Sequence, residues 1–185
     1  MNPRDRTPVG ALRPNQSPLE SRLDPVRAIP RQRGHDVEPV TSIGQLNELV
    51  DCKKSGYKFI ISEPVHVGGQ NCAPTPLEFL LSGAVGCYAA VFAFYAAKLG
   101  VTYDSFEAVA RTDFDVRGHM MADAPTSAFQ KVTISISVVS DASEDRLKEV
   151  ERLSFEGCPG INTLREPVPV ETKLTVTRTA AEKAA

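Results

Sequence analysis

Two cysteines, Cys87 and Cys158, lie in sequence surroundings that suit a pair of reactive thiols. Cys87 is in the middle of the longest apolar run of the chain, and Cys158 follows Gly157 in the short segment FEGCPGINTL. A sulfenic acid on one sulfur condenses readily with a nearby thiol, so a shielded thiol on a helix and a second thiol on a turn are the parts of a dithiol redox site. Such a site requires the two Cα atoms to approach within about 4.4–6.8 Å.

Each cysteine also has a purely structural interpretation. Small neighbours of Cys87, among them Gly83, Gly86 and Ala90, let another backbone approach closely, but a cysteine in such a place equally serves as a small core side chain. Cys158 lies on a rigid turn, where reactive groups are often presented, yet it also suits the end of a helix. The residues by themselves leave both interpretations open.

The other potential ligands and nucleophiles show weaker patterns. No C-x-x-C pair occurs among the four cysteines, and the chain has three histidines, His35, His66 and His119. A tetrahedral zinc site lacks its usual spacing, and we expect neither a metal nor a cofactor. Cys52 and Cys72 are interpreted as incidental thiols, Cys72 being the one expected at the surface. A further hypothesis for the function is a cysteine-based acyl transferase or hydrolase, for which His66 is the candidate base.

The composition restricts the class of partner. A chain of 185 residues suits one domain, and its net charge of −2 with a pI near 5.9 gives no reason to expect nucleic acid or an anionic membrane surface. The N-terminus has no apolar segment behind its charges, so we expect the reducing cytoplasm. The partner is then a small molecule or another protein.

A long helix is predicted over residues 75–99. Thr75 suits the N-cap, Pro76 suits the first helical position, and Gly100 supplies the stop. The segment is apolar enough for a membrane span, but it is rich in Ala and Gly and lies between strand patterns, which favours a helix buried in a core.

The remaining elements follow from periodicity and turn residues. Apolar spacing predicts a short helix over residues 43–50, and residues 57–62 read as a strand. Alternation predicts three more strands, at 106–117, 132–138 and 170–176. An amphipathic helix, capped by Asp141 or Ser143, is predicted to end at Gly157, and Asn162 or Thr163 is a candidate cap for one more helical turn. The order indicates an α+β fold, with an antiparallel sheet wrapped over a central helix.

We expect three parts along the chain. Residues 1–36 are rich in Pro and Arg without a regular apolar period, and they are interpreted as a flexible arm that is solvated or lies along a partner subunit. Residues 37–180 form the folded domain, and residues 181–185 form a disordered tail.

Two motifs resemble the OsmC/Ohr family. One is EPVHVGGQNCAPTPLEFLLSGAVGC, in which a Gly-Gly turn and a proline-rich start lead into the helix that holds Cys87. The other is GCPGINTLREPVPVE around Cys158. The resemblance covers most of residues 57–178, whereas the part before about residue 55 does not visibly match. It implies an OsmC-like fold assembled as an intertwined homodimer, with two helices back to back at its centre and peroxidase sites at the subunit interface.

The same resemblance implies a thiol-dependent peroxidase. Cys87 would attack an organic hydroperoxide or H₂O₂, Cys158 would resolve the sulfenic acid as a disulfide, and a dithiol such as a lipoylated protein would reopen it. The hydroperoxide-resistance members also use an Arg, held by a Glu just after the helix-starting Pro. Here Leu77 occupies that place, with Glu78 one residue later, and no Arg occurs between Arg33 and Arg111.

Glu78 is therefore a candidate catalytic residue. It lies one residue beyond the family's Glu position, and one residue along a helix is a rotation of about 100°, so its side chain is expected to face another direction. The candidates to replace the family's Arg are Lys53, Lys54, His66 and an Arg from the N-terminal arm. The alternative function is a non-catalytic or ligand-binding OsmC-like protein in which Cys87 is not activated. Gly160 stands where the family often has bulkier residues, which leaves the size of the substrate open.

Overall fold

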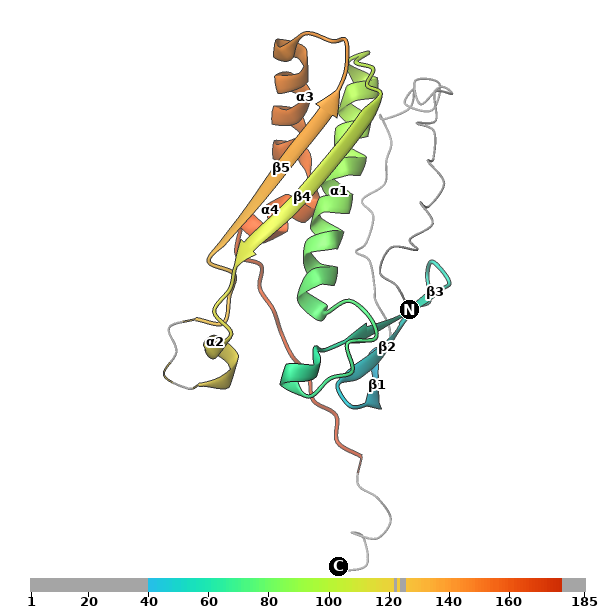
Figure 1. Ribbon diagram of the computed structural model, residues 1–185. Helices are drawn as coiled ribbons and strands as arrows, with labels where there is room; N and C mark the ends of the chain where they lie inside the picture. Colours follow the sequence, from blue (N-terminus) through green and yellow to red (C-terminus); the bar gives the residue numbers. More distant parts are fainter. Residues whose placement is uncertain (1–39, 122, 124–125, 178–185) are drawn as a thin grey trace, which may run out of the picture.

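The computed structural model describes residues 40–121, 123 and 126–177. The predicted N-terminal arm, residues 1–36, and the whole predicted tail, residues 181–185, lie outside these ranges. The chain folds around one long helix, α1 (Pro76–Lys98), as Figure 1 shows. A three-stranded sheet lies near the start of α1, and a two-stranded sheet runs beside the rest of it. This confirms the mixed α+β fold with antiparallel sheets and a long central helix.

Helix α1 begins where its capping residues predict. The side-chain oxygen of Thr75 accepts a hydrogen bond from the Glu78 backbone N–H at 3.2 Å, and a Glu78 carboxylate oxygen accepts one from the Thr75 N–H at 2.7 Å. This reciprocal pair is a capping box, and Pro76 takes the first helical position. After Lys98 the chain turns at Gly100, whose φ of +61° is easy for glycine.

The segment after β1 (Val40–Gly44) corrects the predicted helix over residues 43–50. The chain turns back at Gln45 and Leu46, both with positive φ, into β2 (Asn47–Cys52), which pairs antiparallel with β1 and with β3 (Tyr57–Ser62). The helical spacing of apolar residues was coincidental, because Ile43 and Leu46 are exposed and Val50 is buried. A tight turn and strand pairing therefore prevail over the weak local helical pattern.

The second sheet holds β4 (Ser105–Asp113) and β5 (Lys131–Val139), paired antiparallel in continuous register. Both strands alternate exposed and half-buried side chains, as predicted, although β4 ends before residue 117, where the short helix α2 (Arg117–Met120) begins. Phe106 of β4 packs against Phe92 of α1 with ring centroids 4.8 Å apart. The half-buried face of the sheet thus covers one side of α1.

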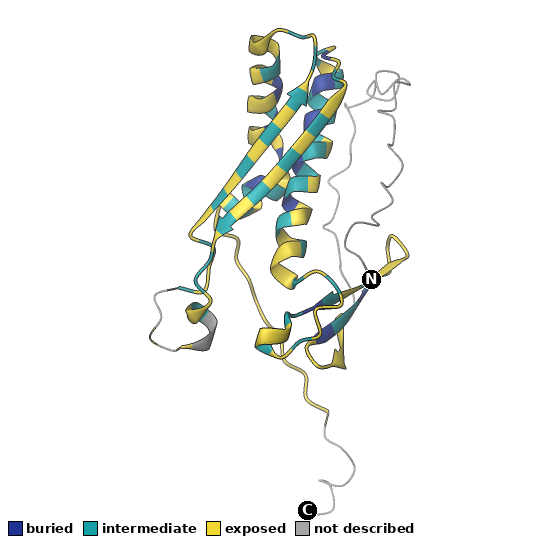
Figure 2. Cartoon of the chain, in the orientation of Figure 1, coloured by how far each residue is buried: buried dark blue, intermediate teal, exposed yellow. Residues whose placement is uncertain are grey.

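Helix α3 (Glu144–Gly157) begins after Ser143 and ends at Gly157, as predicted. The next helix, α4 (Pro159–Arg165), has Cys158 rather than Asn162 or Thr163 at its N-cap. Both helices pack on α1, and most of the buried hydrophobic residues form one cluster around it, which makes up the dark blue positions near α1 in Figure 2. The cluster comprises Tyr88, Phe92, Ala96, Val101, Val150, Cys158 and Ile161.

The strand predicted over residues 170–176 is absent. Residues 166–177 form neither helix nor strand, and they run away from the body of the chain (Figure 1). Val170 and Leu174 are 85% and 87% exposed. A strand needs another strand beside it to satisfy its backbone groups, and the described chain provides none for this segment.

Candidate dithiol site

The two predicted redox cysteines lie in one place, between α1 and the α3–α4 junction. Cys158 is completely buried in the hydrophobic cluster, and the partly exposed Cys87 packs against that cluster. Both are free thiols. The structure therefore brings together two residues that are far apart in the sequence.

Gly160 explains how closely the two elements approach. A Cβ atom at this position would lie 3.1 Å from the Cβ and 3.4 Å from the Sγ of Cys87, and 3.4 Å from the Cα of Ala84. The first turn of α4 thus rests directly on α1 beside the Cys87 thiol. The sequence pointed to Gly160 as a difference from the family, but its contact with Cys87 becomes visible only in the fold.

The junction that carries Cys158 is held by hydrogen bonds across its ends. The side-chain amide of Asn162 donates to the Glu156 carbonyl at 2.9 Å, and the Asn162 backbone N–H donates to the Cys158 carbonyl at 2.9 Å. Gly157 lies so close to Tyr95 that an added Cβ would be 2.9 Å from its hydroxyl oxygen. The residues of the GCPGIN segment therefore fix the turn on which the second thiol is presented.

Burial is the main cause that raises the pKa of the Cys158 thiol. The nearby Cys87 acts in the same direction, whereas hydrogen bonds from the backbone N–H groups of Ile161 and Gly160 act in the opposite direction. The net effect is a raised pKa, so Cys158 holds its proton at neutral pH. It is thus suited to give up a proton after its partner has reacted, rather than to react first.

The structure does not bring Glu78 to the thiols. Its carboxylate bonds the backbone and side chain of Thr75, which lowers the pKa of Glu78 and fixes it at the exposed start of α1. Cys87 lies nine residues further, or about 13 Å along the helix. In the described part of the chain, no hydrogen bond or ion pair joins an arginine to Glu78. Glu78 therefore has a helix-capping role here.

His66 is also placed away from the dithiol. It belongs to the short helix η3 (Val65–Val67) and lines a cavity of about 700 Å³ together with Thr75, Pro76 and Leu77. Pro76 and Cys87 are separated by about 16 Å along α1. This geometry gives no support to a cysteine–histidine hydrolase.

The two remaining cysteines lie in the three-stranded sheet and its following loop. Cys52 ends β2 opposite Tyr57, and the exposed Cys72 has its sulfur 3.5 Å from the side-chain oxygen of Asn47. Among the described residues, no group of three or more His, Cys, Asp or Glu side chains is arranged to hold a metal ion.

Comparison with known proteins identifies the family. The family model described as OsmC-like protein matches residues 68–173, which is more than half of the chain and includes both thiols. The chain belongs to the OsmC-like protein family. No curated protein matches the sequence.

Solved structures extend the likeness to the fold. An OsmC-like protein from Mycoplasma pneumoniae is 17% identical with a TM-score of 0.62, over 72% of this chain and 88% of that one. An OsmC-like protein of unknown function from Vibrio cholerae is 19% identical with a TM-score of 0.53, over 64% and 79%. An organic hydroperoxide resistance protein from Legionella pneumophila is 13% identical with a TM-score of 0.52, over 72% and 92%. Proteins with different descriptions thus share this fold, and the fold does not choose among activities.

Proposed function

We propose that this OsmC-like protein is a thiol-dependent peroxidase that reduces organic hydroperoxides or H₂O₂. The observation that supports the proposal most is the unequal exposure of two neighbouring thiols, with Cys87 partly exposed and Cys158 completely buried. A peroxide arriving from solvent meets Cys87 first. The buried thiol is then available to the oxidised product.

In the proposed first step, the Cys87 thiolate attacks the peroxide ROOH. The O–O bond breaks, one oxygen becomes part of a Cys87 sulfenic acid, and the other leaves as the alcohol ROH after taking up a proton. In the second step the Cys158 sulfur attacks the sulfenic sulfur. A disulfide forms, and the sulfenic oxygen leaves as water with the Cys158 proton.

A dithiol reductant, for example a lipoylated protein, then returns the pair to thiols by exchange and becomes a disulfide itself. The chemistry needs no metal or cofactor. We place it in the cytoplasm, where a reducing supply keeps the thiols available.

We also propose that the protein works as a homodimer. Much of α1 is apolar yet open to solvent in the single chain, with Leu80 50% exposed. Helix α1 is long enough and apolar enough to cross a membrane, but the core helices of soluble proteins meet the same two criteria. The exposed apolar alternation of residues 168–176 is a second surface that a partner subunit would cover.

The test treats reduced protein with one equivalent of cumene hydroperoxide and counts free thiols over time. Wild type should lose two thiols quickly, Cys158→Ser should accumulate a stable sulfenic acid, and Cys87→Ser should oxidise slowly. Cys72→Ser, which removes an exposed thiol outside the site, is the matched control and should behave as wild type. Equal, slow loss in all four proteins refutes the peroxidase.

The second candidate is a non-catalytic, ligand-binding protein. The hydrogen bonds between Thr75 and the Glu78 carboxylate favour the binding protein, because they hold the carboxylate at the N-terminus of α1, away from Cys87. The thiol count separates the two functions, since the binding protein predicts no difference between Cys87→Ser and wild type.

A further inference from the structure

The two cysteines of the dithiol site differ in their access to solvent, and the chain itself causes the difference. Cys158 is 0% exposed, whereas Cys87 is partly exposed. A second subunit can cover more of the surface, but it cannot open a residue that its own chain already buries. While the fold stays closed, a reagent in solution therefore reaches the site at Cys87 or not at all.

Cys87 lies on the border between a buried and an exposed flank of α1. Ala84 and Tyr88 on one flank are buried, whereas Gly83 and Ala90 on the other flank are exposed. A Cβ atom added at Gly83 would meet no atom within 4 Å, so the exposed flank is open in the single chain. Cys158 belongs to the same cluster as Tyr88, on the buried flank, and its thiol is hydrogen-bonded to that of Cys87. The two sides of the Cys87 sulfur thus face Cys158 and the open flank.

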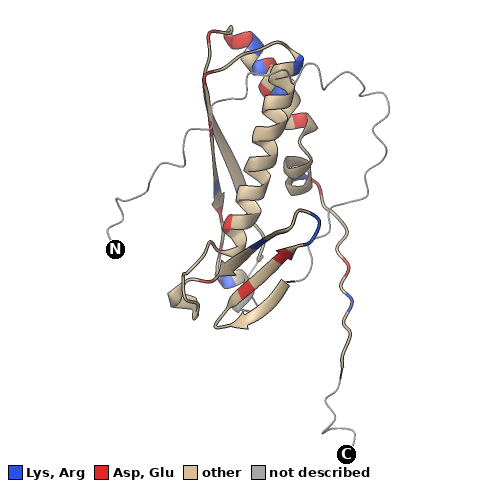
Figure 3. Cartoon of the chain, turned by 90° about the vertical axis from the view of Figure 1, so that its right-hand side faces the viewer, with Lys and Arg blue, Asp and Glu red and all other residues tan. Residues whose placement is uncertain are grey.

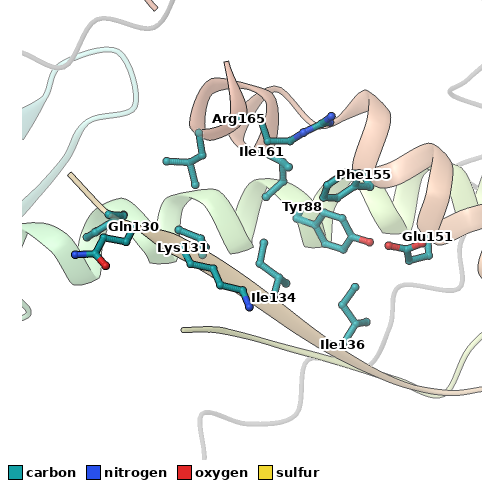
Figure 4. Close-up of a pocket in the computed structure, with 12 residues that line it drawn as sticks. Tyr88, Gln130, Lys131, Ile134, Ile136, Glu151, Phe155, Ile161 and Arg165 are labelled. Carbon is teal, nitrogen blue, oxygen red and sulfur yellow. The ribbon is translucent and has the colours of Figure 1, made fainter. Parts of the chain in front are cut away.

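The cavity beside Tyr88 gives no second route to Cys158. It has a volume of about 320 Å³, and Figure 4 shows it between β5, α3, α4 and the Tyr88 side chain of α1. Ile161 and Tyr88 in its wall are 4% and 1% exposed. No cysteine is among the described residues that line the cavity. Cys158 therefore stays closed on this side as well.

Access and leaving-group ability oppose each other at this pair. Disulfide exchange is faster when the leaving thiol has a lower pKa, and burial raises the pKa of Cys158. The backbone N–H groups of Gly160 and Ile161 hydrogen-bond the Cys158 sulfur, which lessens the disadvantage because they stabilise the thiolate. Access decides the direction, because a sulfur that no reagent reaches cannot be attacked.

We propose that a reductant thiol attacks the oxidised pair at Cys87, from the flank of Gly83, and that Cys158 is the leaving thiol. An incoming thiolate approaches a disulfide sulfur opposite the bond that breaks, and for Cys87 that direction is the open flank. The inference rests on the proposed function, in which the Cys87–Cys158 disulfide is reduced in each turnover.

The exchange balances in two steps. The reductant thiolate bonds to the Cys87 sulfur, the Cys87–Cys158 bond breaks, and its electron pair stays on the Cys158 sulfur, which takes up a proton. The second thiolate of the dithiol then attacks the reductant sulfur of the mixed disulfide and releases Cys87 as a thiolate. The dithiol loses two electrons, and the cysteine pair gains them.

The first experiment locates the mixed disulfide in the full-length Cys52→Ser, Cys72→Ser double variant, which keeps only the two site cysteines. Diamide closes the disulfide, the monothiol cysteamine is added, and samples are quenched with acid at short times. Free thiols are then blocked, and the digested protein is mapped by mass spectrometry. At the earliest times cysteamine should be found on Cys87 about tenfold more often than on Cys158, because only Cys87 is open to attack. In urea the two positions should be labelled equally.

The second experiment closes the open flank in the same double variant. Gly83→Leu adds a side chain about 40° around the helix from Cys87, and Ser82→Leu adds the same side chain about 140° away. Gly83→Leu should slow reduction of the diamide-formed disulfide by cysteamine about tenfold, whereas Ser82→Leu, the matched control, should leave the rate unchanged. Equal rates in the two variants overturn the direction of attack.

The outcomes separate this inference from the peroxidase. Cysteamine found first on Cys158, or equally on both cysteines of the folded protein, overturns the inference alone. If diamide closes no disulfide between Cys87 and Cys158, the inference and the proposed function fall together. Since diamide replaces the peroxide here, an inactive peroxidase whose disulfide is still opened at Cys87 refutes only the proposed function.

Discussion

Helices α1 and α3 differ in how far one chain can bury them. Helix α3 carries a narrow apolar stripe opposite charged residues, and its inward residues Val150 and Ser154 are fully buried. Helix α1 is apolar on all sides, but the chain buries one stripe, Ala84, Tyr88, Phe92 and Ala96. Figure 3 shows charges gathered on α3 and a long shaft of α1 without them. A helix that is apolar on all sides is normally buried on all sides. The single chain therefore buries most of the apolar surface of α3 but leaves part of the apolar surface of α1 exposed.

The largest effect is expected from a substitution that disrupts the proposed dimer contact of α1. Leu80→Asp places a charge on the exposed apolar face and should prevent dimer formation, because the charge would lose its water at the interface. Analytical ultracentrifugation should show wild type at twice the chain mass of 20.0 kDa and the variant at that mass. Lys148→Asp, on the exposed side of α3, should remain a dimer. A monomeric wild type contradicts the dimer.

The second prediction concerns the covered helix. Val150→Ala should lower the free energy of unfolding by about 2–3 kcal/mol, because it removes two buried methyl groups and leaves a cavity. Urea unfolding at several protein concentrations measures it. The loss should be the same at each concentration, since Val150 is buried within the chain. Lys148→Ala should change the free energy by less than about 0.5 kcal/mol.

The third prediction concerns the contact between α1 and α4. Gly160→Ala inserts a Cβ atom 3.1 Å from that of Cys87, so the helices must separate slightly, at a cost of about 1–3 kcal/mol. Formation of the Cys87–Cys158 disulfide after peroxide addition should become about tenfold slower, as followed by quenching and mass spectrometry. The rate of the first oxidation of Cys87 should change less. An unchanged disulfide rate would show that Gly160 does not control the approach of the thiols.

The fourth prediction tests the start of α1. Thr75→Ala removes the hydroxyl that accepts the Glu78 N–H, and it should cost about 1 kcal/mol. Chemical denaturation measures this loss, and Thr75→Ser, which keeps the oxygen, should lose much less. If Glu78 has its proposed alternative role in catalysis, Glu78→Gln will slow peroxide reduction more than Thr75→Ala does.

The smallest effect is the pH dependence that Cys158 contributes. Its pKa is raised in the folded state, so above the ordinary thiol value of about 8.5 the folded protein binds more protons than the unfolded one. The stabilisation is complete below that value and is lost as the pH rises through the raised pKa. Wild type should therefore lose more stability than Cys158→Ser between about pH 7 and about pH 10. Parallel pH profiles of the two proteins would contradict the raised pKa.

Local sequence signals predicted the elements whose ends are set by nearby residues. Thr75, Pro76 and Gly100 defined α1, Ser143 and Gly157 defined α3, and alternation defined β4 and β5 with an error of a few residues. The failures depend on strand pairing. Residues 43–50 have an apolar spacing compatible with a helix, and the hairpin forms because β2 pairs with strands on both sides.

The candidate site shows the same division. The residue types and the two motifs were enough to single out Cys87 and Cys158, and to notice that Leu77 and Glu78 differ from the family pattern. They gave no sign of the cavity beside Tyr88, whose wall combines β5, α3 and α4. In the sequence, aromatic and isoleucine residues that line a cavity cannot be distinguished from residues of the packed core, because the pattern does not show the space between them.

The sequence by itself determined that two cysteines, one in an apolar helix and one on a Gly-Pro turn, belong to a mixed α+β chain. That follows because caps, turns and periodicity act over a few residues. The tertiary structure alone decided that Gly160 lets α4 rest on α1 beside Cys87, and that Cys158 is fully buried while Cys87 is not. These facts depend on packing between segments distant in sequence, and packing is set by the shapes of all the side chains at once.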